Sequence, residues 1–209
     1  MNLANFFVVQ YQGGTQGCPF HLPGGLNQER LEWDLYEKNP FDITIKKEYV
    51  YTVTDPDIES IEFDLYGSGT KFVSDKFLDM CVELNVKFRA IPLEIVLNGK
   101  RISNKKYFLF IPGDYNALMD VLASDFSEEL DVESGGVMMN KIFPSHPIYS
   151  KINRFVPKFG ITSHFFRCIE LMDLVCTREF MSKTHEKKLH GIRFVPIDDT
   201  YRFDPWADW

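Results

Sequence analysis

The side chains in this sequence that could do chemistry are its histidines, cysteines and clustered acids, and their spacings match no familiar catalytic or metal site. His185 and His190 are five positions apart, so on a helix they would point about 140° apart, and no histidine pair has a metal-binding spacing. His164 and Cys168 would share a strand face, but about 13 Å apart, too far for a thiolate–imidazole pair. The sequence therefore predicts no catalytic residue, no metal site and no cofactor.

The four cysteines, Cys18, Cys81, Cys168 and Cys176, form no Cys-x-x-Cys pair. This favours reduced, buried thiols, as in a cytoplasmic protein. The glycine-rich stretch at 13–17 follows a predicted strand, as phosphate-binding loops do. It lacks the Gly-Lys-Ser/Thr ending and runs into Cys18-Pro19, so we expect a surface loop there.

Acidic residues are concentrated in two stretches that lack lysine and arginine, although the net charge of the chain is only −7. The first, 48–70, contains Glu48, Asp55, Asp57, Glu59, Glu62 and Asp64. The second, 107–140, contains Asp114, Asp120, Asp125, Glu128, Glu129, Asp131 and Glu133. The net charge argues against non-specific binding to nucleic acid or to an anionic membrane, and the acidic block at 125–133 favours docking of a basic protein partner. A merely solvated acidic loop is the alternative.

The chain ends in DDTYRFDPWADW, where aromatic and acidic side chains alternate at high density. Such aromatic residues either pack back on the body or serve as interface anchors. Combining the tail with the second acidic stretch, we predict a partner-binding surface composed of Asp125, Glu128, Glu129, Asp131, Glu133, Trp206 and Trp209.

A six-residue motif occurs twice in the segments that must position these side chains. The motif is Arg-x-[Ile/Val]-Pro-[Leu/Ile]-[Glu/Asp], at 89–94 and 193–198. Each copy follows a predicted helix, capped by Ser74 in one case and Thr177 in the other. This agreement predicts a duplicated helix–strand unit. Because proline is tolerated mainly at sheet margins, both closing strands should begin or lie at an edge.

Hydrophobic periodicity predicts strands near 6–11, 43–53, 61–65, 107–111, 137–143 and 163–171, and a third short helix at 115–123. In the 61–65 strand, Glu62 and Asp64 should face water, and Asn98-Gly99 should turn a hairpin. We expect an α+β fold with mostly antiparallel sheets and two or three short helices. It should form a single compact domain, 1–209, comprising a β-rich part (1–70), a first unit (71–143) and a second unit with the tail (144–209).

Two groups of motifs resemble the immunity proteins of bacterial polymorphic toxin systems, specifically immunity protein family eleven. The first group is FVSDKF at 72–77 with the strand at 88–92. The second is HFFR at 164–167, LVCTREF at 174–180 and the strand at 192–198. The chain departs from the family pattern at Cys176-Thr177, where a plain Val-Ser is expected, and its first 70 residues match no part of it.

The resemblance implies a cytoplasmic protein that binds a cognate toxin tightly and blocks its active site, without catalytic residues of its own. An acidic inhibitor would suit a nuclease or nucleotide-modifying toxin with a basic cleft. A non-catalytic adaptor is the main alternative, and an enzyme without a recognisable motif is a further one. We find no predicted signal peptide or apolar run long enough for a bilayer, and the sequence leaves the oligomeric state open.

Overall fold

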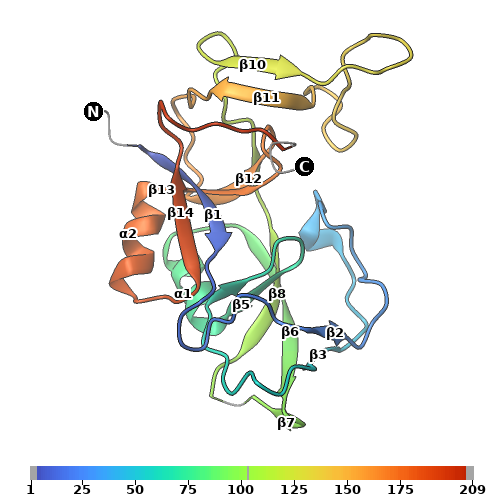
Figure 1. Cartoon of the computed structure of the whole chain (residues 1–209), viewed down its shortest axis with the longest axis vertical. Helices are drawn as coiled ribbons and strands as arrows, with labels where there is room; N and C mark the ends of the chain where they lie inside the picture. Colours follow the sequence, from blue (N-terminus) through green and yellow to red (C-terminus); the bar gives the residue numbers. More distant parts are fainter. Residues whose placement is uncertain (1–3, 103, 206–209) are drawn as a thin grey trace.

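The structure, a computed structural model, describes residues 4–102 and 104–205, which form two β-sheets, a pair of helices and a projecting two-stranded arm (Figure 1). The five-stranded sheet has the order β14-β1-β13-β12-β9, and the seven-stranded sheet has the order β2-β3-β6-β8-β5-β4 with β7 beside β6. Each sheet is mixed, because it contains one parallel pair: β9 with β12, and β3 with β6. The α+β class is thus confirmed.

The strands of the five-stranded sheet are β14 (Ile192–Pro196), β1 (Phe6–Tyr11), β13 (Leu174–Thr177), β12 (Phe165–Cys168) and β9 (Tyr115–Asn116). Those of the seven-stranded sheet are β2 (Gly24–Leu26), β3 (Tyr49–Val53), β6 (Phe88–Leu97), β7 (Lys100–Arg101), β8 (Tyr107–Pro112), β5 (Lys71–Ser74) and β4 (Leu65–Tyr66). The helices are α1 (Asp75–Glu83), α2 (Arg178–Glu186) and the short 3-10 helix η1 (Pro40–Asp42), and the arm contains β10 (Asp125–Glu128) and β11 (Tyr149–Arg154).

The repeated phrase belongs to two segments with the same order of elements and the same pairing. In β5-α1-β6, the two strands lie on either side of β8, and β4 pairs with the other edge of β5. In β13-α2-β14, the two strands lie on either side of β1, and β12 pairs with β13. The central strand follows its unit in the first case and precedes it in the second.

Both helices begin where the sequence predicts, because a hydroxyl side chain satisfies a free amide of the first turn. The Oγ atoms of Ser74 and Thr177 accept hydrogen bonds from the amides of Phe77 and Phe180. The helices contact each other through the rings of those two phenylalanines, whose centroids are 5.9 Å apart, and through ion pairs from Glu83 to two lysines of the α2 end. This pair joins the two sheets.

The prediction that both proline-containing strands begin or lie at a sheet edge is right for only one of the two repeated motifs. Pro196 ends β14, an edge strand. Pro92 lies inside β6, which has neighbours on both sides, so the expected margin position is wrong for that strand. However, β6 pairs with β3 only from Leu93 onward. Pro92 therefore has no β3 residue opposite it, and its lack of an amide proton costs no hydrogen bond with β3.

Three predicted elements differ from those in the structure because side chains accept hydrogen bonds from the backbone amides. The expected helix at 115–123 is absent: the Glu170 carboxylate binds the amides of Leu118 and Met119 at 3.0 Å, and β9 pairs with β12. The strand predicted at 137–143 is broken, because Asn140 Oδ1 accepts from the amides of Ile142 and Phe143. The strand predicted at 43–53 is shortened to β3, because the Glu32 carboxylate binds the amides of 46 and 47.

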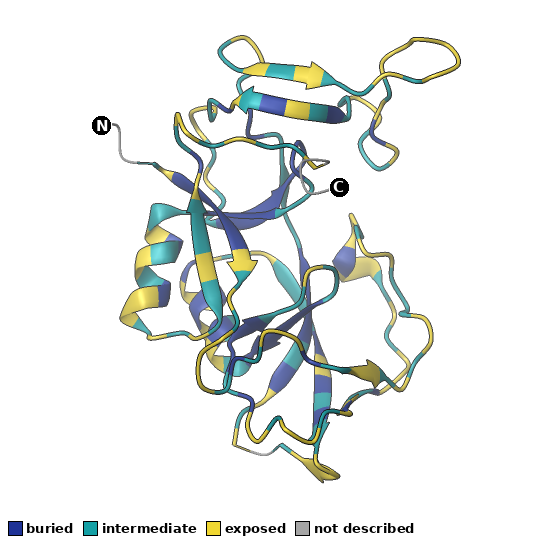
Figure 2. Cartoon of the chain, viewed as in Figure 1, coloured by how far each residue is buried: buried dark blue, intermediate teal, exposed yellow. Residues whose placement is uncertain are grey.

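The arm stands on the five-stranded sheet through its own hydrophobic cluster. Tyr149, Ile152 and Phe155 pack there with buried residues of β1 and β12, including Phe6 and Phe166. The opposite side of the arm and its loops are open to solvent (Figure 2). The fold therefore supports the arm firmly at its base and leaves its far side uncovered.

Candidate functional site

The structure places the predicted acidic residues together in the arm, but not on one face. Asp125 and Glu128 are the ends of β10, and Glu129, Asp131 and Glu133 follow in the loop that leads toward β11. Asp125 and Glu133 are exposed, whereas the other three are partly covered. The predicted residues Trp206 and Trp209 lie outside the described residues.

Residues 129–138 form a small hairpin, which we call the tip hairpin. Its amides and carbonyls pair across it: Met138 N donates to Glu129 O, and Asp131 N donates to Gly136 O, both at 2.8 Å. The Asp131 carboxylate accepts from Ser134 N and Oγ at 2.8 and 2.7 Å, and these bonds lower the pKa of that carboxyl. The tip hairpin is therefore held in shape before any partner arrives.

The other acids of the arm have no lysine or arginine partner in the described part of the chain. No ion pair with lysine or arginine involves Asp125, Glu128, Glu129 or Glu133 among the residues that the structure describes. The basic side chains of β11 are engaged elsewhere: Lys151 pairs with Asp204, and Arg154 donates to a backbone carbonyl. The charge of these four acids is thus available to a partner.

The described part of the aromatic tail packs back on the body. Phe203 forms a backbone bridge with Ile152 of β11, and Tyr201 lies against Phe155, where burial raises the pKa of its hydroxyl. These residues belong to the hydrophobic cluster beneath the arm. Up to Pro205, the tail therefore supports the arm rather than offering free anchors.

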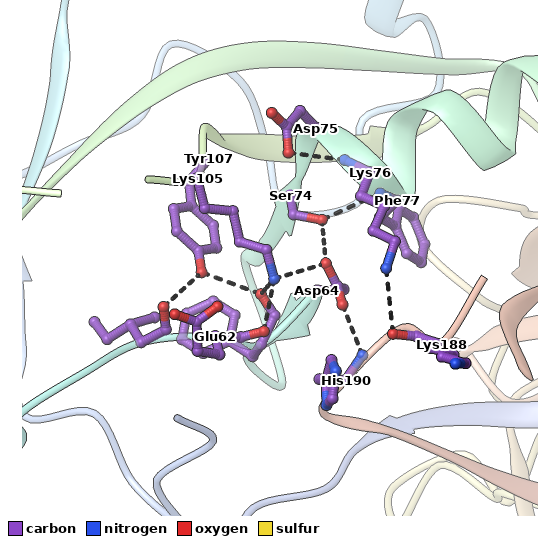
Figure 3. A network of polar contacts seen from close by, with 12 residues as sticks. Glu62, Asp64, Ser74, Asp75, Lys76, Phe77, Lys105, Tyr107, Lys188 and His190 are labelled. Carbon is purple, nitrogen blue, oxygen red and sulfur yellow. Dashed lines mark hydrogen bonds and ion pairs between the residues drawn. The ribbon is translucent and has the colours of Figure 1, made fainter. Parts of the chain in front are cut away.

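The first acidic stretch contains a residue that sequence reasoning misplaced. Asp64 does not face water but is fully buried, and its carboxylate accepts from Ser74 Oγ at 2.5 Å and from His190 N at 2.6 Å (Figure 3). Lys105 Nζ lies 2.9 Å from the same carboxylate. One buried acid thus binds the N-cap of α1, the loop before β8 and the loop after α2.

This network links elements and offers no reactive centre. Ser74 and Asp64 have no exposed surface, so no substrate can reach either oxygen. Lys105 Nζ also donates a hydrogen bond to Glu62 O at 2.6 Å, so a second N–H of its ammonium group has an acceptor. In the sequence, Asp64 alternates with apolar residues, which suggested that it faces solvent. Nothing in the local pattern distinguished Asp64 from Glu62.

A second buried charge lies between the two sheets. Lys71, at the start of β5, is only 4% exposed, and its ammonium donates to the carbonyls of Gly67 and Ser68 at 2.7 Å each. Burial lowers its pKa to about 8, and the nearby Asp173 opposes that shift. Lys71 and Asp173 line a cavity of about 400 Å³ together with Tyr11, Phe20 and Tyr66.

The lowered pKa of Lys71 makes stability depend on pH in a defined window. Because the folded protein releases this proton near pH 8 and the unfolded chain near 10.5, the free energy of unfolding should rise with pH between those values. We expect wild type to gain about 2 kcal/mol relative to Lys71→Met between pH 7 and 9.5. Urea titrations of both proteins at each pH would measure this. The control is Lys76→Met, at an exposed lysine of α1. It retains Lys71, so its difference in stability from wild type should be the same at each pH.

A larger groove of about 640 Å³ lies between the N-terminal end of α2 and the segment after β11. His164 Nδ1 is 3.0 Å from Thr177 Oγ1, and Glu179 is 3.8 Å from the same ring. The groove also contains Arg178, whose guanidinium is held by Ala4 O. The His164–Thr177 contact orients the cap of α2, and the described residues contain no group of three or more metal-binding side chains.

The cysteines are all free and buried, as expected. Burial raises the pKa of Cys81, Cys168 and Cys176, and the Glu170 carboxylate raises that of Cys168 further. These thiols are therefore poor nucleophiles at neutral pH. None of the described helices is long and apolar enough to cross a bilayer.

Residues 26–203 match the family model described as Immunity protein 43. The match spans both groups of motifs that carry the resemblance and most of the stretch before residue 71. It confirms the resemblance to immunity proteins of polymorphic toxin systems, with family 43 in place of family eleven. A search of curated proteins finds no match.

Proposed function

The chain belongs to the Immunity protein 43 family of immunity proteins against toxins, and from this premise we propose that it blocks its cognate toxin by occluding a basic active-site cleft. The occluding surface is the arm, with Asp125, Glu128, Glu129 and Glu133 directed at lysine and arginine side chains of the toxin. A cleft of that kind binds phosphate groups, for which dense carboxylates substitute electrostatically.

The observation that carries this proposal is the absence of internal ion pairs for those four acids in the described part of the chain. Elsewhere the protein uses its acids internally, as at Asp64 and at Glu83. Unpaired like charges on one projecting element cost stability by mutual repulsion, and a basic partner relieves that cost. The arm is also well supported, so little order must be gained on binding.

Because a polymorphic-toxin immunity protein is expected to be encoded beside its toxin, the test is co-expression with a toxin-like reading frame adjacent to this gene, followed by co-purification and a growth assay. We expect a complex that survives purification at micromolar concentration, and cells that grow only when both proteins are present. Separate elution together with unprotected cells would overturn the function. Binding without protection would instead indicate an adaptor.

We further propose that the two strand–helix–strand units arose from one duplicated unit. Equal helix lengths, equivalent caps and the same strand order around β8 and β1 support this. The arm lies between the units in sequence and has no counterpart in either. The proposed toxin-binding surface would therefore be an addition to a repeated frame.

A further inference from the structure

The tip hairpin carries its apolar side chains on the outside. Leu130 and Val137 are bridge partners and so lie on the same face. Met139, directly after the tip hairpin and itself the bridge partner of Pro147, lies two residues beyond Val137 and so belongs to that face as well, whereas Val132 lies in the turn at the end of the hairpin. Their exposed fractions are 54% for Leu130, 99% for Val132, 43% for Val137 and 45% for Met139.

The opposite face of the tip hairpin contains acidic residues and is more covered. It carries Glu129, Asp131 and Met138, which are all partly buried. A hairpin on a soluble body normally turns its apolar face inward and its charges outward. The reversed arrangement here gathers exposed apolar surface of the kind that marks a protein interface.

Exposed apolar residues also concentrate in the arm and at its base more than elsewhere. Of the eleven large hydrophobic side chains found exposed among the described residues, seven fall between 121 and 159: Val121, Leu122, Leu130, Val132, Val137, Met139 and Phe159. Four of them lie in the tip hairpin or directly after it: Leu130, Val137 and Met139 share one face, and Val132 lies in the turn.

We propose that this apolar face of the tip hairpin inserts into an apolar groove of the toxin whose rim carries lysine and arginine. The inference rests on the proposed function and names the contact that gives the complex its lifetime. Charge argues for this occupant over a second copy of the chain. A symmetric pairing of two tip hairpins would bring Glu133 and the neighbouring acids of each copy together, and like charges at an interface are strongly unfavourable.

Internal hydrogen bonds make the tip hairpin suitable for insertion. The Asp131–Ser134 bonds and the Gly135 turn, with φ of +68°, fix the loop that presents Val132. An apolar side chain held rigidly at a tip loses little conformational freedom when it enters a groove. Such centrally placed anchors dominate the dissociation rate of protein complexes.

The test replaces Val132 by aspartate and measures binding to the purified product of the neighbouring toxin reading frame. We expect affinity at least about tenfold weaker, mainly through faster dissociation, with an unchanged melting temperature because Val132 is 99% exposed. Val82→Asp is the matched control: the same substitution at an exposed valine of α1, 65% accessible, should leave binding unchanged.

The outcomes separate this inference from the function itself. A wild-type complex that Val132→Asp leaves equally tight would overturn the insertion and keep the immunity function. No complex with wild type would overturn both. Sedimentation of the free protein decides between occupants: a dimer that Val132→Asp dissolves would mean that a second copy covers the face, and would overturn the toxin groove.

Discussion

Asp64→Ala is expected to lower the free energy of unfolding by about 3–5 kcal/mol, the typical cost of removing one partner from a buried ion pair. The variant leaves Lys105 without its carboxylate and removes the acceptors of Ser74 Oγ and His190 N. Because Asp64 joins α1, the loop before β8 and the loop after α2, the loss should affect both sheets in one transition. Urea unfolding followed by far-UV and near-UV circular dichroism would measure it.

Glu59→Ala is the control for Asp64, since Glu59 is an exposed acid in the same stretch and should change stability by less than about 0.5 kcal/mol. A double-mutant cycle with Asp64→Asn and Lys105→Met should show a favourable coupling between the two residues. A loss below about 1 kcal/mol for Asp64→Ala would contradict the linking role of the buried acid.

Reversing four acids of the arm to lysine, at Asp125, Glu128, Glu129 and Glu133, should slow association with the toxin by about 10–100-fold at low salt. The variant should also lose the decrease of association rate with added salt that electrostatic attraction produces. Asp131 is left unchanged because its carboxylate shapes the tip hairpin. Stopped-flow association rates over a range of salt concentrations would test this.

The matched control carries the same number of reversals at exposed acids around β2 and β3: Glu29→Lys, Glu48→Lys, Asp57→Lys and Glu59→Lys. It has the same net charge as the arm variant, so it separates the local field of the arm from the overall charge. Equal slowing in both variants would mean that net charge alone steers the toxin. An unchanged rate in the arm variant would move the contact elsewhere.

Local signals allowed the elements with local causes to be predicted. The N-caps Ser74 and Thr177 and the hairpin at Asn98-Gly99 depend on side chains within a few residues of the backbone that they shape. The acidic stretch at 125–133 was likewise visible in the sequence as a concentration of charge, and its role as a binding site stays a prediction. Its division into β10 and the tip hairpin was not visible, since it depends on pairing with residues 136–154.

The elements that sequence reasoning missed are shaped by partners distant in the chain. Glu170 takes the amides of Leu118 and Met119 from across about fifty positions, and His190 comes to Asp64 from 126 positions away. The residues next to Glu170 and Asp64 in the sequence do not indicate that these two acids are buried. The inverted tip hairpin escaped prediction for a similar reason: the alternation of Leu130 and Val132 with acids fits an ordinary strand, and only the structure shows which face is covered.

The position of β1 between β13 and β14 has a consequence for how protection begins in the cell. Both partners of β1 lie among residues 174–196, so the edges of β1 stay unpaired until those residues have been made. Such long sequence separation gives a high contact order and slow folding. Sheet closure, and with it the support of the arm, is therefore a late event. A newly made chain would neutralise toxin only after residues 174–196 have been made and have paired with β1, which favours a standing pool of folded protein over synthesis on demand.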